Sequence, residues 1–260
     1  MSHLLVFGLG YTAGYLARYL SARGWSIEAT GRAGTIAFDD DAAVHAAIGR
    51  ATHILSTVPP GDDDADPVLA RYGDALGVAP CWVGYLSATG VYGDTGGAWV
   101  DETAPIGRGR RTARAAADLA WQGLGRPTHL FRLPGIYGPG RSALDRIRAG
   151  TARRIALPGQ VFSRIHVADI VSGVVAGMDG PAGVYNLADD HPCSQNDIIE
   201  HGSALLGLAP PPLQGLQEAA LSPAAQAFYG ENRRIANGKA KRLLGWRPLY
   251  PDYRAGLTAC

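Results

Sequence analysis

The sequence predicts an α/β protein with a doubly wound parallel sheet and a small C-terminal lobe rich in helices. Two observations carry this prediction. Short apolar runs alternate with segments of helical periodicity from the N-terminus to about residue 187, which is typical of successive βαβ units. The first apolar run is followed directly by the glycine-rich segment 8–13, which joins it to a helical segment.

The apolar runs are predicted as strands and the segments between most of them as helices. The expected strands cover residues 3–7, 25–30, 35–38, 52–58, 81–87, 129–133 and 184–187. The expected helices cover residues 13–22, 42–49, 67–76, 111–124 and 167–178. We expect one unit over residues 1–260, with a nucleotide-binding core and a smaller substrate lobe. The core would hold 1–135 and 166–188, and the lobe 136–165 and 189–260.

The composition is that of a globular protein, because 47% of the residues are hydrophobic and 18% are charged. No apolar run reaches the roughly 18 residues that a membrane span needs, and no basic segment precedes the first apolar run. The cysteines are odd in number and far apart, at Cys81, Cys193 and Cys260, which disfavours a disulfide framework and a zinc site. We therefore expect a cytoplasmic protein with no metal and no membrane partner.

The net charge of +1 conceals a basic middle segment. Residues 101–154 contain eleven Arg and only four acidic residues. Such a segment is able to attract an anionic ligand, or it forms a solvated basic face. The pI near 7.8 and the lack of a recognition motif argue against a nucleic-acid partner.

The segment from Gly8 through Gly10, Tyr11 and Thr12 to Ala13 has the pattern G-x-G-x-x-A. Gly8 permits a tight turn, Gly10 lets the backbone approach a pyrophosphate, and Ala13 allows close packing of helix on strand. The N–H groups and partial positive charge of the following helix N-terminus favour phosphate. Placed after the first strand of a βαβ series, the pattern predicts a Rossmann-type site for a nicotinamide dinucleotide.

The end of the second expected strand bears on the choice between NAD and NADP. An NAD enzyme usually places an acidic residue there for the ribose 2′-hydroxyl, but here Glu28 lies inside the strand. Arg32 follows the strand, where a guanidinium suits a 2′-phosphate. The sequence favours NADP, although Arg32 as a plain surface residue and an approach of 39–41 to the adenine remain open.

Four further segments carry a family resemblance that runs nearly end to end. They are 85–93 (YLSATGVYG), 132–141 (RLPGIYGPGR), 164–170 (RIHVADI) and 184–187 (VYNL). The chain resembles the extended short-chain dehydrogenase/reductases of the NAD-dependent epimerase/dehydratase superfamily. The resemblance implies a small-molecule substrate and a homodimer through the helices near 67–76 and 111–124. It also implies cofactor contacts from Ser56, Thr57, Ser87 and Pro134.

The residues of that family's catalytic triad are not matched. The family uses a Ser or Thr together with Tyr and Lys in the pattern Y-x-x-x-K, which places both on one helix face. The only lysines are Lys239 and Lys241, and neither follows a tyrosine at that spacing. By position, Ala88 replaces the Ser or Thr, Arg110 the Tyr and Arg114 the Lys. Because a guanidinium keeps its proton up to about pH 12, Arg110 cannot serve as the acid/base.

Other residues are candidates for the missing chemistry. Tyr92 and Tyr137 are possible replacement acids, although tyrosines there are more typically packed residues. His166 can titrate near pH 7 or orient the start of a helix. A phosphate or carboxylate is a possible partner of a group of arginines, which are otherwise exposed helix charges. These are Arg110, Arg111, Arg114 and Arg141.

Two functions therefore stay open. One is an NADP-dependent oxidoreductase or epimerase that acts on a small anionic, sugar-like or phosphorylated substrate by a non-standard acid/base. The other is a sensor or regulatory protein that binds NADP without turnover.

Overall fold

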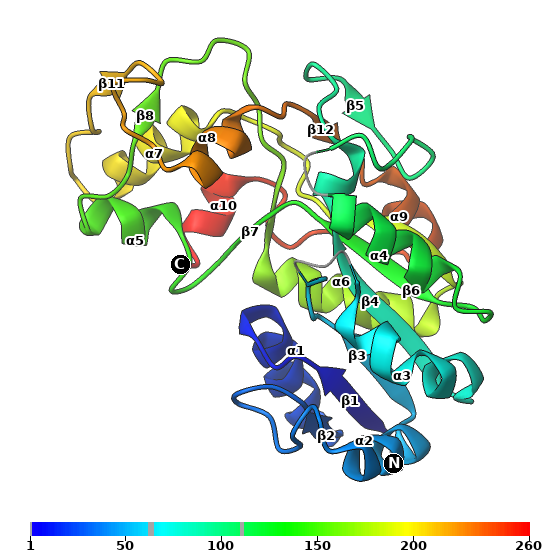
Figure 1. Ribbon diagram of the computed structural model, residues 1–260. Coiled ribbons are helices and arrows are strands. Elements are labelled where there is room, and N and C mark those ends of the chain that lie inside the picture. Colours follow the sequence, from blue (N-terminus) through cyan, green and yellow to red (C-terminus); the bar gives the residue numbers. More distant parts are fainter. Residues whose placement is uncertain (1, 62–64, 110–111) are drawn as a thin grey trace.

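The core of the molecule is a six-stranded sheet in which every paired strand is parallel, in the order β10-β6-β4-β3-β1-β2. The computed structural model describes residues 2–61, 65–109 and 112–260 (Figure 1). The strands of this sheet are β1 (His3–Phe7), β2 (Ser26–Ala29), β3 (His53–Ser56), β4 (Trp82–Ala88), β6 (His129–Leu133) and β10 (Gly183–Asn186). The order steps outward from β1 in both directions, which is a doubly wound arrangement with β2 at one edge.

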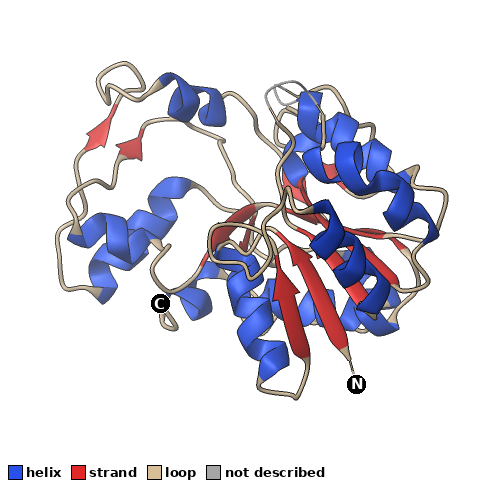
Figure 2. Cartoon of the chain, turned by 60° about the horizontal axis from the view of Figure 1, so that its bottom comes forward, coloured by secondary structure: helices blue, strands red, loops and turns tan. Residues whose placement is uncertain are grey.

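Helices cover both faces of this sheet, as Figure 2 shows. They are α1 (Tyr11–Ser21), α2 (Asp41–Arg50), α3 (Pro67–Val78), α4 (Thr112–Gln122) and α6 (Val167–Asp179). Alternate residues of β1 face opposite sides, as the period of a strand requires. Leu4 and Val6 belong to the hydrophobic cluster of α1 and α6, whereas Leu5 and Phe7 belong to that of α2, α3 and α4. The predicted doubly wound sheet is confirmed.

Helix α4 borders the functional site and is fixed on the sheet by Trp121, which is fully buried. The Trp121 ring stacks on Tyr85 of β4, with ring centroids 5.1 Å apart and planes 8° apart. Its indole N–H donates to Asp66 at 2.8 Å, and Asp66 also caps the N-terminus of α3. Helices α3 and α4 are thus tied to each other as well as to the sheet.

The smaller lobe lies beside the core and is mainly helical (Figure 1). Its elements are α5 (Ala143–Arg148), β8 (Arg154–Ile155), α7 (Gln195–Leu205), β11 (Leu213–Gln214), α8 (Pro223–Tyr229) and α10 (Tyr253–Leu257). Two short pairs join it to the core: β7 (Gly135–Tyr137) with β9 (Arg164–His166), and β5 (Trp99–Val100) with β12 (Arg234–Ile235). The 3-10 turn η1 (Thr89–Tyr92) follows β4 directly.

The chain returns from the lobe to the core at α9 (Gly238–Leu243), before α10 ends it in the lobe. Ala240 and Trp246 join the hydrophobic cluster of α1 and α6. The Trp246 indole N–H also donates to the carbonyl of Asp169 at 3.2 Å and to the Ser172 hydroxyl at 3.0 Å. This segment therefore clamps the N-terminal half of α6.

The strand predicted at 35–38 is wrong. Only Ile36 forms a bridge, to Thr30, and the amides of Thr35 and Ile36 both donate to the carbonyl of Ala29. The chain therefore folds back against the end of β2 instead of running beside it, and Phe38 packs edge-on against Phe7. No helix in the described ranges is both long and apolar enough to cross a membrane.

Candidate functional site

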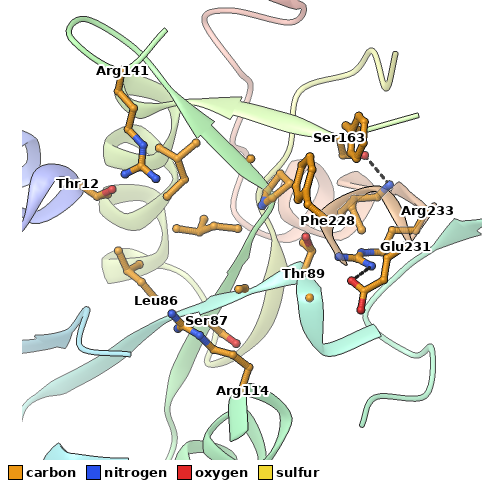
Figure 3. Close-up of a pocket in the computed structure, with 18 of the residues that line it drawn as sticks. Thr12, Leu86, Ser87, Thr89, Arg114, Arg141, Ser163, Phe228, Glu231 and Arg233 are labelled. Atoms are coloured by element: carbon orange, nitrogen blue, oxygen red, sulfur yellow. Dashed lines mark hydrogen bonds and ion pairs between the residues drawn. The ribbon is translucent and has the colours of Figure 1, made fainter. Parts of the chain in front are cut away.

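A cavity of about 500 Å³ lies between the carboxyl edge of the sheet and the lobe. It is lined by the glycine loop, the ends of β3, β4 and β6, and residues of the lobe. In Figure 3, Thr12 and Arg141 lie at one end of it and Glu231 and Arg233 at the other, with Thr89 between them. Of the predicted cofactor residues, those that line this cavity are Gly10, Tyr11, Thr12, Thr57, Ser87 and Pro134.

Gly8 makes the turn from β1 into the loop with a φ of +88°, which favours glycine. A Cβ atom here would also lie only 2.9 Å from the Val58 side chain. The Thr57 hydroxyl donates to the Gly8 carbonyl at 2.6 Å, and the Gly8 amide donates to the Thr30 hydroxyl at 3.3 Å. The loop is thus held to the ends of both neighbouring strands.

Gly10 stands at the N-terminus of α1 and faces open space. No heavy atom outside its immediate neighbours lies within 4 Å of the position where a Cβ would be, and its φ of −90° suits any residue. No side chain caps this helix, so the first amides of α1 have no side-chain partner at the cavity. Free amides with this empty space beside them fit a pyrophosphate.

Two other residues of the motif, Tyr11 and Ala13, pack against other parts of the chain. Ala13 is buried beneath the loop and packs in the core. The Tyr11 hydroxyl donates to the Pro139 carbonyl at 3.1 Å, and the Arg141 guanidinium lies 5.6 Å from the centre of the Tyr11 ring. Arg141 is therefore placed beside the glycine loop and at the cavity.

The charged residues in and after β2 separate into engaged and free groups. Glu28 is engaged, because its carboxylate pairs with Arg50 and with His3, each at 2.9 Å. Arg32 is exposed directly after Gly31 and forms no ion pair with a described residue. Glu28 lies in β2 opposite Leu5 of β1, two residues before Thr30, whose hydroxyl accepts from the Gly8 amide.

Two of the residues 39–41, the alternative adenine contact, have carboxylates with other partners. Asp40 caps α2 by accepting from the amide of Ala43 at 3.0 Å. Asp41 forms an ion pair with Arg71 at 2.7 Å. Ser56 lies below the cavity and does not line it; its hydroxyl is buried without a hydrogen-bond partner in the described part of the chain.

Ser87, which lines the cavity from β4, belongs to a buried polar network. Its hydroxyl donates to Asp118 at 2.5 Å, and Asp118 forms an ion pair with Arg132 at 2.7 Å. Asp118 is 0% and Arg132 3% exposed. The Ser87 hydroxyl is thus committed to α4 although its residue borders the cavity.

Ala88 and Thr89 follow Ser87 along the cavity. Ala88, predicted to stand at the triad's Ser or Thr position, offers only a methyl group. Thr89 also lines the cavity (Figure 3), and its hydroxyl makes no hydrogen bond to any described residue. Thr89 therefore presents a free hydroxyl next to Ala88, which has no hydroxyl of its own.

Arg114 lines the cavity from α4 and is partly buried. Burial raises the pKa of Tyr85 to about 12, and the nearby positive charge of Arg114 offsets part of that effect. Arg110 and Arg111, predicted at the tyrosine position and beside it, lie outside the described residues. Of the predicted arginines in this part of the chain, the structure therefore places Arg114 at the cavity.

The two candidate acids do not line this cavity. The Tyr92 hydroxyl donates to Asn186 at 2.8 Å and accepts from Arg132 at 2.9 Å, so Tyr92 belongs to the buried network. The Tyr137 hydroxyl is buried without a described partner, and burial raises its pKa far above the usual value. Neither phenol is therefore poised to exchange a proton in the cavity.

His166 caps α6, because its Nδ1 accepts from the amide of Ala168 at 3.2 Å. Burial lowers the pKa of His166 to about 4. A histidine with this pKa is neutral near pH 7. The structure therefore gives His166 the helix-orienting role that the sequence left as one of its two alternatives.

Sequence reasoning missed an ion pair in the cavity, between Glu231 and Arg233 at 2.8 Å. Arg233 also donates to the carbonyl of Gly93 at 2.7 Å, which joins the segment before β12 to the loop after η1. No local pattern marked these residues, because they lie in an irregular segment far along the chain from the other residues at the site.

The chain is similar to known proteins, of which three are described here, whereas no family model matches it. A functionally unknown conserved protein from Silicibacter pomeroyi DSS is 43% identical, with a TM-score of 0.89 over 100% of this chain and 98% of that one. The human epimerase family protein SDR39U1, solved with NADPH, is 17% identical, with a TM-score of 0.78 over 98% of this chain and 97% of that one. At this identity the likeness shows the fold alone.

The third relative is a 3-diazoavenalumate denitrifying reductase from Streptomyces sp. It is 35% identical over 159 residues, which are 55% of this chain. The match spans about half, 48%, of the reductase. The fold of the chain is thus that of NAD(P)-binding epimerase/dehydratase proteins.

Proposed function

We propose, from the premise that this chain belongs to the family of the conserved Silicibacter pomeroyi protein, that it is an NADP-dependent oxidoreductase. The cofactor would lie along the glycine loop, and a small anionic substrate would enter the same cavity from the lobe. The partial match to a reductase supports an enzyme of this class.

The observation that carries the proposal is the empty space at Gly10. Open space at its Cβ position adjoins the uncapped N-terminus of α1, and both face the cavity. Gly8, Gly10, Tyr11, Thr12 and Ala13 would form the pyrophosphate site, because backbone amides and the helix dipole favour phosphate. Thr57, Ser87 and Pro134 would border the remainder of the cofactor, and Ser56 would support the site from below.

NADP is proposed over NAD because of the charges after β2. The Glu28 carboxylate is paired with Arg50 and His3 and is therefore not available to a ribose hydroxyl. Arg32 is exposed and unpaired among the described residues, so its guanidinium is available to a 2′-phosphate.

When bound, the nicotinamide would supply or accept a hydride. In the direction of reduction, the hydride would be added to the carbonyl carbon of the substrate, and negative charge would develop on the carbonyl oxygen. Arg114 would stabilise this charge, and the Thr89 hydroxyl would donate a hydrogen bond to it. Because Arg114 keeps its proton near neutral pH, the proton that completes the reduction would come from water.

A specific observation also favours a second function, that of a cofactor-binding sensor. Neither tyrosine candidate lines the cavity. The resemblance also predicts Ala88 and Arg114 at positions where the superfamily has a hydroxyl and a lysine. In that case NADP would be bound and released without chemical change.

Turnover separates the two functions. The purified chain is incubated with NADPH and a panel of small carbonyl compounds that carry a carboxylate or a phosphate, and the absorbance of reduced nicotinamide is followed. An enzyme consumes NADPH with at least one compound, and Thr89→Val slows this without changing NADPH affinity. Tight binding of NADPH with no consumption across the panel would contradict the oxidoreductase and support the sensor.

A further inference from the structure

A second cavity, of about 390 Å³, lies inside the lobe and adjoins the first. We call it the lobe pocket. The two share part of their lining, formed by Gly135, Ile136, Arg141, Phe162, Ser163 and Phe228. Elements β7, α5, α7, α8 and α10 all contribute to the lobe pocket. A molecule held there is therefore next to the first cavity.

The walls of the lobe pocket are mainly apolar. Phe162 and Phe228 stack face to face on the side shared with the first cavity, with ring centroids 4.5 Å apart and planes 6° apart. Ile136, Ile198 and Leu257 enclose other sides. Ligand pockets typically measure roughly 300–1,000 Å³, so this volume suits a small body with an apolar ring or branched chain.

Arg164 brings a buried positive charge to this pocket, since its side chain is only 8% exposed. One terminal nitrogen donates to the carbonyls of Phe162 at 2.7 Å and Cys193 at 3.1 Å. The same nitrogen contacts the Cys193 sulfur at 3.3 Å. The other terminal nitrogen donates to the Ser194 carbonyl at 3.4 Å and to Gln195 Oε1 at 3.2 Å. All of these acceptors are neutral, so the charge has no carboxylate partner in the described part of the chain.

The other charges around the pocket do not cancel it. Arg146 lines the same pocket from α5, is exposed, and forms no ion pair with a described residue. Arg141 stands at the border with the first cavity. The acid in the lining, Asp145, accepts from the amide and hydroxyl of Ser142 at 2.7 and 2.8 Å and lies 3.8 Å from Arg148.

Asp189 is the carboxyl group packed behind Arg164, and its amide donates to the Arg164 carbonyl at 2.7 Å. It does not line the pocket. Burial raises the pKa of Asp189 to about 8, so this carboxyl is mostly neutral near pH 7. The pocket therefore has an excess of positive charge beside apolar walls.

We infer that the lobe pocket binds the substrate of the proposed oxidoreductase by a carboxylate attached to a small apolar body. The inference rests on the proposed function only for the reaction; binding in the lobe pocket is a separate property. A single carboxylate matches the Arg146 fork next to the buried Arg164 charge. A nucleotide sugar needs a larger space and many polar partners for its hydroxyls, which these walls do not offer.

The test is calorimetric titration of the full chain, with and without saturating NADPH, using four probes. The first is 3-phenylpropanoate, and the second is its uncharged amide, 3-phenylpropanamide. The third is phenethyl phosphate and the fourth UDP-glucose. We expect 3-phenylpropanoate to bind at least tenfold more tightly than the amide, because a hydrogen bond to a charged group is worth about a factor of ten to a hundred. The phosphate and the nucleotide sugar should bind more weakly than the carboxylate.

The matched variants are Arg146→Gln and Arg148→Gln, two residues apart on α5. Arg146 lines the pocket and Arg148 does not, and both are exposed, so the fold should withstand either change. Arg146→Gln should weaken 3-phenylpropanoate about tenfold and leave NADPH unchanged, whereas Arg148→Gln should alter neither.

Equal affinity for acid and amide, tighter binding of phenethyl phosphate or UDP-glucose, or equal effects of the two variants would each overturn the inference. The NADPH titration of the same samples keeps the outcomes apart. Loss of NADPH binding contradicts the proposed function, and a failure of the carboxylate with NADPH bound contradicts the lobe pocket alone.

Discussion

The hydroxyl of Ser87 donates to the Asp118 carboxylate at 2.5 Å, and both side chains are almost fully buried. Asp118 also accepts two hydrogen bonds from Arg132, at 3.0 and 2.7 Å. These contacts join β4, α4 and β6 directly below the cavity. The network therefore sets the position of α4, which carries Arg114, and it engages the hydroxyl of Ser87.

Asp118→Asn should destabilise the fold strongly. The change leaves the Arg132 guanidinium buried without its counter-charge, and breaking a buried ion pair in this way costs about 3–5 kcal/mol. Denaturant unfolding followed by circular dichroism measures the loss. Glu200→Gln removes the partly exposed ion pair with Arg154 and should cost at most about 1 kcal/mol. Equal losses for the two variants would show that the buried pair does not stabilise α4.

Arg32→Ala should change the choice of cofactor. We expect NADPH affinity to fall about tenfold to a hundredfold, because charged hydrogen bonds to the 2′-phosphate are lost, while NADH affinity stays constant. Calorimetric titration with both cofactors measures this. Arg23→Ala, at an exposed position just after α1, is the control and should affect neither affinity. Equal weakening of NADPH and NADH by Arg32→Ala would refute the assignment.

Asp189 should make stability fall as the pH rises. Its folded-state pKa of about 8 lies above the value of about 3.9 for an unfolded chain, so the folded state holds the proton longer. The resulting stability is complete below about pH 4 and is lost as the pH rises through 8, at up to about 1.4 kcal/mol for each pH unit.

His166 acts in the opposite direction, because its folded pKa of about 4 lies below its usual 6.5. His166 is present in both wild type and Asp189→Asn and contributes equally to each, so the difference between the two isolates Asp189. Wild type should lose up to about 2 kcal/mol relative to Asp189→Asn between pH 6.5 and 8. A difference in unfolding free energy that stays constant with pH would contradict the raised pKa.

Local patterns were sufficient to predict the sheet and the glycine loop. The alternation within β1 assigns Leu4 and Leu5 to opposite faces, and the spacing of Gly8, Gly10 and Ala13 is a contiguous signal. Residues 35–38 misled because an apolar run also suits a loop. Thr35 and Ile36 share one carbonyl there, and no sequence pattern indicates such a bond.

The candidate site was predictable only where it is local. Arg164 depends on carbonyls of segments about thirty residues further along the chain, so its buried, unpaired charge became visible only in the folded chain. Glu231 and Arg233 are held at the cavity by the hydrogen bond from Arg233 to the Gly93 carbonyl, which is far from them in sequence. Charge counts indicated a basic segment, but they do not tell which arginines converge.

The central claim is that a nicotinamide dinucleotide binds at Gly8–Ala13, and titration of NADPH into Gly10→Val tests it most directly. The added side chain enters open space, so folding should be unaffected, while the space proposed for the pyrophosphate is filled. Gly49→Val, at an exposed helix position that also has open space around it, is the matched control. The account predicts one NADPH bound per chain in wild type and in Gly49→Val, and at least about a hundredfold weaker binding in a folded Gly10→Val. NADPH affinity equal to wild type in Gly10→Val would contradict it.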